Sequence, residues 1–234
     1  MSYFYEVLIY DDVDSKNLFY EKILKLSKSK KYQEIRRIVE NELLKKNEHP
    51  EFTQFLKWQY WTSTYNLKKT DMATCLLELY QLLKKSTLGT DSYIELQIKN
   101  SIANIYAENN QTEKSIILYE EILKYEVSKE GFIDLKIKVL YNYGRSLYLQ
   151  EKYDLSLLQN EEGFQLCIEN RNMNLIGHLL FQKAECLEKL NYSFQEISMV
   201  YQKAHFFFEL LNLEYYQNII KNKKSMYLHT TLTS

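Results

Sequence analysis

Four histidines are the residues of this chain most suited to catalysis or metal binding, but their spacing supports neither. His49, His178, His205 and His229 lie far apart, and none belongs to an HExxH-like pair. The sequence also has no glycine-rich phosphate loop and no GxSxG or cysteine–histidine signature. We therefore expect no enzyme activity, no catalytic residue, no metal site and no cofactor.

Side-chain amides are better candidates, because an amide offers both a donor and an acceptor and can hold the peptide bond of an extended ligand. Asn100 and Asn104 are four residues apart and so share one helix face. Asn142 lies on the corresponding face of the next repeat, and His178 and Gln182 on that of the one after. From spacing alone, two exposed surface asparagines remain an equal interpretation of Asn100 and Asn104.

A group of lysines could bind an anion. Lys25, Lys28, Lys30 and Lys31 lie at the end of an expected helix and in the turn that follows. They could also simply compensate the negative end of the helix dipole, which contributes about 0.3–1 kcal/mol. Charge alone favours this second interpretation.

Composition indicates a helical, cytoplasmic protein. With only 5 Gly and 1 Pro in 234 residues, few positions interrupt a helix. Lys and Arg number 30 and Asp and Glu 31, so the basic excess of a DNA-binding module is absent. We see no apolar run long enough to cross a membrane and no signal peptide. The scattered Cys75, Cys167 and Cys186 are expected to be reduced thiols in the core.

The elements that position these residues follow from a repeat centred on residues 139–166. There, Gly144, Leu147, Ser156 and Gly163 supply the small or apolar side chains that two closely packed helices need. The same register recurs every 40 or 41 residues, at Ile23, Ser63, Ala103, Gly144 and Ala184. This step is nearer the HEAT range of about 40–47 residues than the TPR period of about 34. We favour TPR-like repeats because the second-helix slot follows 12 residues after the first, at Ser115 and Ser156.

The sequence thus predicts an all-α fold of about five TPR-like helix pairs. We divide it into a connecting helix at residues 1–14, the five repeats at 15–212, and a capping helix with a disordered tail at 213–234. Trp58 and Trp61 are expected in the core. The expected helix pairs are 17–27 with 32–46, 50–67 with 71–85, 92–108 with 112–127, 133–149 with 153–170 and 175–189 with 194–211, followed by a cap at 214–227.

Five long runs carry a resemblance to a known family. They are FYEVLIY at 4–10, HPEFTQFLKWQY at 49–60, IANIYAENN at 102–110, LIGHLLFQKAECLEKL at 175–190 and KAHFFFELL at 203–211. In order and spacing they resemble the quorum-sensing transcription regulators of Gram-positive bacteria that bind peptide pheromones through TPR domains. The resemblance implies a right-handed superhelix that forms a homodimer and holds a short secreted, re-imported signalling peptide in its concave groove.

The family also carries an N-terminal helix-turn-helix, whereas this sequence begins at what resembles the connecting helix. DNA contact is therefore expected only through a module that this sequence lacks, as in an excised domain or a natural truncation. Two other functions stay open. One is a TPR scaffold that docks a larger protein partner; the other is a truncated, dominant-negative dimerisation partner of a full-length regulator.

The resemblance also assigns roles to residues that match the family's peptide contacts. Lys28 and Lys30 stand where lysines meet the peptide's acidic side chain or its C-terminal carboxylate. Asn100 and Asn142 stand where asparagines hold the peptide backbone, with Asn104 beside Asn100.

Tyr5 and Tyr216 occupy the aromatic positions that flank the peptide. Gln182 is retained, but His178 departs from the motif, which carries Gln at this point and bears on which peptide is accepted. We expect His178 to make affinity for an acidic peptide change between about pH 6 and 7.5, where an unperturbed histidine titrates.

Overall fold

The computed structural model describes residues 16–27, 29–45, 49–84, 92–125 and 130–228, and within these ranges the regular structure is entirely helical. Each expected helix is present, with ends that differ from the prediction by at most a few residues. Residues 16–27 are helical and precede α2 (Tyr32–Leu43), α3 (Pro50–Asn66), α4 (Met72–Lys84), α5 (Tyr93–Glu108), α6 (Thr112–Leu123), α7 (Glu130–Leu149), α8 (Tyr153–Glu169), α9 (Ile176–Lys189), α10 (Phe194–Leu210), α11 (Glu214–Lys223) and the 3-10 turn η1 (Ser225–Tyr227).

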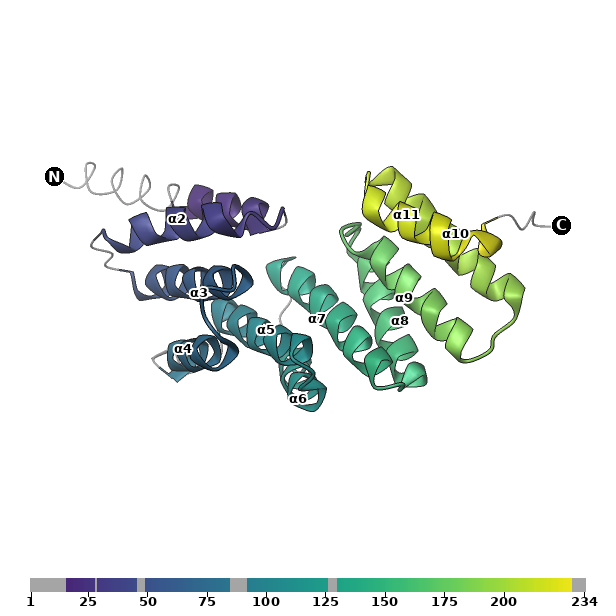
Figure 1. Cartoon of the computed structure of the whole chain (residues 1–234), viewed down its shortest axis with the longest axis horizontal. Helices are drawn as coiled ribbons and strands as arrows, with labels where there is room; N and C mark the ends of the chain where they lie inside the picture. The colour runs from purple at the N-terminus through teal and green to yellow at the C-terminus, as the bar shows by residue number, and fades with distance from the viewer. Residues whose placement is uncertain (1–15, 28, 46–48, 85–91, 126–129, 229–234) are drawn as a thin grey trace. The chain divides into compact units, whose positions relative to one another are not determined.

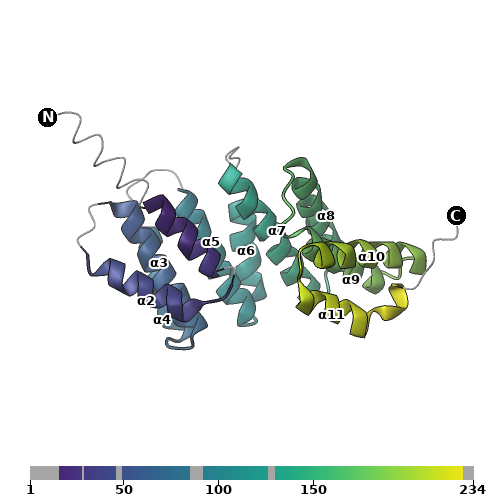
Figure 2. The same cartoon turned by 90° about the horizontal axis from the view of Figure 1, so that it is seen from above.

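The chain forms two compact units, Met1–Ser101 and Ile102–Ser234. In unit 1, α2 packs against α3 and α3 against α4. In unit 2, each helix from α6 to α11 packs against the next, and η1 returns to α10. Figures 1 and 2 both show α7 beside α8 and α9 beside α10, which is the helix-pair arrangement that the repeat register predicts.

Every position of the predicted register is buried. Ile23, Ala103 and Ala184 are fully enclosed, as is the second-helix slot Ser156. Ser156 Oγ donates to the carbonyl oxygen of Gly144 at 2.8 Å, which brings the backbone of α7 against α8. A Cβ atom at Gly163 would lie 2.9 Å from Leu179 Cδ2, so a larger residue there would displace a neighbour. The small residues therefore mark real points of close helix contact.

The helices end in turns that share one geometry. Among the residues that the structure describes, seven other than glycine have positive φ, and all seven lie between consecutive helices. At each turn, the residue after the one with positive φ donates its N–H to the carbonyl oxygen five residues earlier, as Lys152 does to Leu147 at 3.0 Å. This is the hydrogen bond of the Schellman motif. The seven residues are Lys30, Lys68, Asn110, Glu151, Arg171, Asn191 and Asn212.

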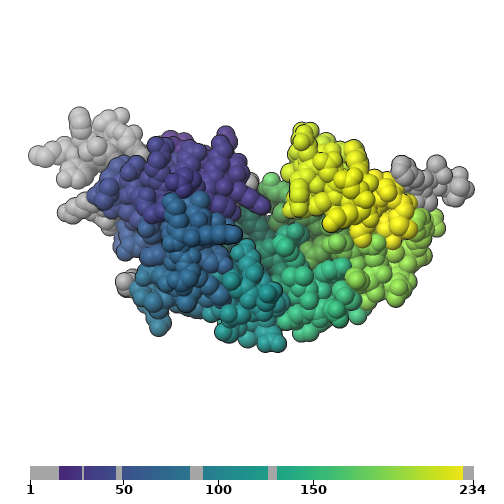
Figure 3. Space-filling model, in the orientation of Figure 1, coloured from purple at the N-terminus to yellow at the C-terminus, as the bar shows by residue number. Residues whose placement is uncertain are grey.

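The C-terminal cap is fixed to unit 2 at its far end. Tyr227 stacks on Tyr201 of α10 with ring centroids 5.1 Å apart, and its carbonyl oxygen accepts from Ser198 Oγ at 2.5 Å. Lys224 pairs with Glu188 of α9, and Tyr201 donates its hydroxyl hydrogen to the same carboxylate at 2.6 Å. Figure 3 shows these C-terminal residues, in yellow, packed directly against the preceding helices. Within the described residues, none of the helices is long and apolar enough to span a bilayer.

The left-handed turns give a test of local strain. The left-handed conformation destabilises an L-residue other than Asn by about 1 kcal/mol or more, whereas glycine adopts it without strain. We expect Glu151→Gly to raise the free energy of unfolding by about 0.5–1 kcal/mol, measured by urea denaturation followed by circular dichroism. Asn191→Gly is the matched control, because Asn already tolerates this conformation and the gain should be smaller. A loss of stability in Glu151→Gly would show that the turn is not strained.

Candidate functional site

His178 lies at the centre of an aromatic enclosure in unit 2. Its ring contacts Tyr216 of α11, Phe208 of α10 and Tyr141 of α7 edge-to-face, with centroid distances of 4.4, 5.2 and 5.8 Å. Its Nδ1 atom is buried and has no hydrogen-bond partner in the structure. The chain thus brings together two of the predicted site residues, His178 and Tyr216, although they are far apart in sequence.

This enclosure changes the acid–base behaviour of His178. Burial lowers the pKa of its imidazole from 6.5 to about 4, because the cation cannot be solvated among three aromatic rings. The ring is therefore neutral throughout the physiological range. The expected change of ligand affinity between about pH 6 and 7.5 assumed an unperturbed histidine, and the lowered pKa of His178 removes this premise.

A buried group of amides lies beneath this enclosure. Gln182 is 5% exposed, and its Nε2 atom has no hydrogen-bond partner. Asn160 of α8 donates through Nδ2 to Ser156 O at 2.7 Å, while its Oδ1 atom is also without a partner. A Cβ atom at Gly144 would lie 3.1 Å from both amide nitrogens, so the absence of a side chain there makes room for them. Gln182 therefore points into the helix packing.

Charged and polar groups lie near the aromatic enclosure. Arg145 of α7 is exposed and forms no ion pair with any described residue. Burial raises the pKa of the Glu185 carboxyl on α9, while Lys224 and Arg145 oppose that rise. Burial also raises the pKa of the Tyr141 hydroxyl to about 12. Asn142 is half-buried, and its amide makes no hydrogen bond within the described part of the chain.

The two asparagines of α5 have different surroundings. Asn104 Oδ1 accepts the hydroxyl hydrogen of Tyr119 at 2.7 Å, which leaves its N–H groups for other partners. Asn100 is buried, and its Oδ1 atom has no partner. Neither is the solvated surface asparagine that was the alternative interpretation of the spacing. A buried, unsatisfied carbonyl oxygen is unusual in a folded protein and costs about 1–3 kcal/mol.

Lys30 is an exposed residue of unit 1 in the left-handed turn before α2. It lies with Lys31 and Arg37 around an open surface hollow of about 570 Å³, in which Glu34 is the one acidic residue among the described part of the lining. This surface is suited to an anion. Lys28 and Tyr5, the other predicted site residues near the N-terminus, lie outside the described residues.

Sequence reasoning missed the contacts that Tyr141 and Phe208 make with His178. The spacing did indicate Arg145, three residues after Asn142 and so on the same helix face. The cysteines are as predicted: Cys75, Cys167 and Cys186 are free and buried. Among the described residues, no group of His, Cys, Asp or Glu could hold a metal ion.

Comparison with known proteins supplies the family. The model of the RNPP family C-terminal domain matches residues 20–229. The chain is similar to apo PlcR of Bacillus thuringiensis, with 44% identity over 94% of this chain and 82% of that chain and a TM-score of 0.88. It is also similar to B. thuringiensis PlcR in complex with the peptide PapR7 and DNA, with 43% identity over 94% of this chain and 79% of that chain and a TM-score of 0.84.

A more distant structure, BtubC from P. vanneervenii, shares 13% identity over 88% of this chain and 86% of that chain, with a TM-score of 0.60. This similarity concerns the fold alone. Comparison with curated protein sequences gave no match. Together, these findings confirm the predicted helical-repeat fold and the resemblance to peptide-responsive regulators.

The lowered pKa of His178 predicts a specific acid sensitivity. As pH falls from 6.5, the unfolded chain protonates this histidine, but the folded protein does so only near its pKa of about 4. The neutral ring therefore makes its full contribution to the free energy of unfolding above pH 6.5. This contribution, about 3 kcal/mol in total, is lost as the pH falls towards 4.

We expect His178→Gln to remove this part of the pH dependence. Urea unfolding at about pH 7 and about pH 4.5 gives the change in the free energy of unfolding between the two pH values, and this change is compared between the wild type and the variant. The carboxylates of the chain contribute equally to both proteins and cancel. An identical change in both proteins would show that His178 keeps an ordinary pKa in the folded state.

Proposed function

This chain belongs to the RNPP family, and from that membership we propose that it is the peptide-binding regulatory domain of a quorum-sensing transcription regulator. The observation that carries the proposal is the match to PlcR, which was solved with PapR7 and DNA and aligns with 94% of this chain. The domain would bind a short signalling peptide and act as a regulator, without enzyme activity.

In unit 2, the polar groups without partners support a peptide site. The amide of Asn142 and the guanidinium of Arg145 make no hydrogen bond or ion pair with any described residue. An extended peptide offers a carbonyl oxygen and an N–H group at each residue, which is what the Asn142 amide can pair with. Arg145 would add a charge-assisted bond to a carboxylate.

We propose that the His178 and Tyr216 rings form the apolar wall of this site. The neutral imidazole can accept or donate one hydrogen bond, as a glutamine amide does, so His178 selects by shape and hydrogen bonding. Asn104 would use its remaining N–H groups for the peptide. Asn100 and Gln182 are buried, so they would contribute only if ligand binding moves the side chains that cover them.

In unit 1, we propose that Lys30 binds the acidic group of the peptide, with Lys31 and Arg37 adding positive charge. Lys28 and Tyr5 are proposed to contact the peptide on the basis of the resemblance alone. The family also supports a cytoplasmic homodimer that reaches DNA through a helix-turn-helix module. Sedimentation analysis of the purified chain tests the dimer.

Titration calorimetry with PapR7 tests the proposal as a whole. Exothermic, saturable binding would distinguish a peptide receptor from a scaffold for a larger protein. A truncated dominant-negative partner would also form mixed dimers with a full-length regulator. No heat with PapR7 or with related acidic-aromatic peptides would contradict the peptide-receptor function.

Asn142→Ala tests the backbone clamp. Removing one amide that pairs with the peptide should cost about 1 kcal/mol, or about a fivefold increase in Kd for PapR7. Asn41→Ala is the matched control, because Asn41 is an exposed helical asparagine of α2. Equal affinity of both variants and the wild type would show that Asn142 does not contact the peptide.

Lys30→Asn tests the anion site while preserving the left-handed turn, since Asn tolerates positive φ. If Lys30 receives a carboxylate, the loss of this charge-assisted bond should weaken PapR7 binding about tenfold, with the effect falling at high salt. Lys68→Asn is the matched control, because Lys68 occupies the equivalent turn between α3 and α4. Similar losses in both variants would indicate a general effect of net charge.

A further inference from the structure

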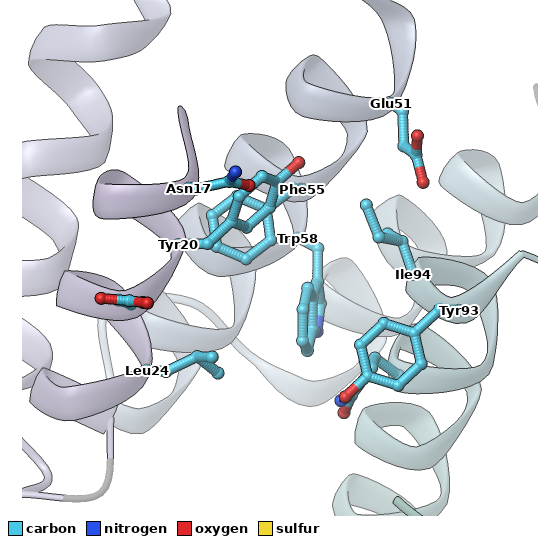
Figure 4. Close-up of a pocket in the computed structure, with 10 residues that line it drawn as sticks. Asn17, Tyr20, Leu24, Glu51, Phe55, Trp58, Tyr93 and Ile94 are labelled. Carbon is cyan, nitrogen blue, oxygen red and sulfur yellow. The ribbon is translucent and has the colours of Figure 1, made fainter. Parts of the chain in front are cut away.

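Unit 1 contains a pocket of about 500 Å³, and none of the predicted site residues that the structure describes lines it. It lies between the helix of residues 16–27, α3 and the start of α5. Figure 4 shows Trp58 at its centre, with Tyr20 and Leu24 on the side of residues 16–27 and Tyr93 on the side of α5.

The aromatic walls of this pocket are held by contacts among its lining residues and with Ser101. Trp58 Nε1 donates to Ser101 Oγ at 2.9 Å, which holds the indole on α3. Gln97 Nε2 donates to the Tyr93 hydroxyl at 2.7 Å. The rings of Tyr20 and Phe55 meet edge-to-face at 4.3 Å. The pocket therefore exists without a ligand, and its π-faces are already in place.

The charged residues in the described lining of the pocket are all acidic. Glu21 and Glu51 line it, and no lysine or arginine is among the described residues of its lining. Neither carboxylate forms an ion pair with any described residue. After burial, the charge of Glu51 is the second cause that raises the pKa of Tyr20 to about 12, so this charge is felt at the aromatic wall. The hollow around Lys30 in the same unit has the opposite charge.

Two alternatives explain part of these features. Glu51 lies in the first turn of α3, where a carboxylate also offsets the helix dipole. Glu21 has no such explanation, because it lies in the middle of residues 16–27. The aromatic walls alone would equally accept an apolar side chain. The combination of fixed aromatic faces with two uncompensated carboxylates selects a cation, because both attract positive charge.

We propose that this pocket binds an organic ammonium group, supplied by the amino terminus or a lysine side chain of the ligand peptide. The proposal rests on the peptide-receptor function for its source, but the ammonium site itself can be tested alone. The cation would lie against Trp58 and Tyr20 and between the two carboxylates, so its desolvation is compensated from two directions.

The direct test uses n-butylammonium as the probe and butan-1-ol as its neutral counterpart. It is made in Trp61→Phe, in which Trp58 is the one remaining tryptophan and its fluorescence reports on the pocket. We expect saturable binding of the ammonium with Kd on the order of millimolar, and about tenfold weaker binding of the alcohol. Equal binding of both probes, or binding of neither, would overturn the proposal.

Glu21→Gln should weaken ammonium binding by about three- to tenfold, because it removes a carboxylate without changing the shape of the wall. Glu162→Gln is the matched control, since Glu162 is an exposed glutamate of α8 in unit 2 and its replacement changes net charge equally. An unchanged Kd in Glu21→Gln, or the same loss in both variants, would contradict the role of this carboxylate.

PapR7 with a free, and with an acetylated, amino terminus identifies the source of the ammonium. Weaker binding of the acetylated peptide, lost in Glu21→Gln, assigns the amino terminus. If acetylation has no effect, an acetylated peptide with lysine as its first residue should bind more tightly, again through Glu21. If the affinity of none of these peptides changes in Glu21→Gln, the ammonium group of the peptide does not enter the pocket and the inference fails. PapR7 binding without ammonium binding would overturn this inference alone, whereas the reverse would overturn the peptide-receptor function.

Discussion

The structure depends on close contact between helices at positions that leave no room for a side chain. The hydrogen bond of 2.8 Å from Ser156 Oγ to the carbonyl oxygen of Gly144 is possible only because α7 and α8 approach at the backbone. At Gly163 the neighbouring Leu179 already fills the space that a Cβ atom would need. These contacts fix the helices of each pair and thereby decide which side chains remain on the exposed face, among them Asn142 and Arg145.

Much of the fold could be predicted because these contacts constrain residue type. A step of 40 or 41 residues between Ile23, Ser63, Ala103, Gly144 and Ala184 was visible in the sequence, and all five are buried. The geometry of the turns was not visible. Lys68, Glu151 and Arg171 adopt left-handed backbone conformations without being residues that normally mark such turns. Their conformation follows from the hydrogen bonds that end each helix, and the side chain has little part in it.

The site was predictable in its residue types and much less so in its electrostatics. The repeat register and the resemblance both indicated His178, and the resemblance indicated Tyr216. The low pKa of His178, however, requires rings from α7, α10 and α11 to meet around one imidazole. No local pattern encodes such an encounter between distant segments. Trp58 shows the same limit: it is buried, as expected of a core tryptophan, yet it also forms the wall of an open pocket. A periodic pattern indicates which face is apolar, but it cannot show whether neighbouring helices close over that face.

Tyr216 lies in α11, the last described α-helix, and this has a consequence for how the domain folds during synthesis. A ribosome releases the chain from the N-terminus onwards, so α7 to α10 can assemble before α11 exists. Until residues 224–227 have emerged, neither the Lys224–Glu188 pair nor the Tyr227–Tyr201 stack can hold α11 in place. In such a nascent chain, His178 lacks the contact with Tyr216, the ring that lies nearest to it in the complete domain. The aromatic enclosure of His178 is therefore completed only after residues 214–227 have been synthesised, when α7 to α10 can already have assembled.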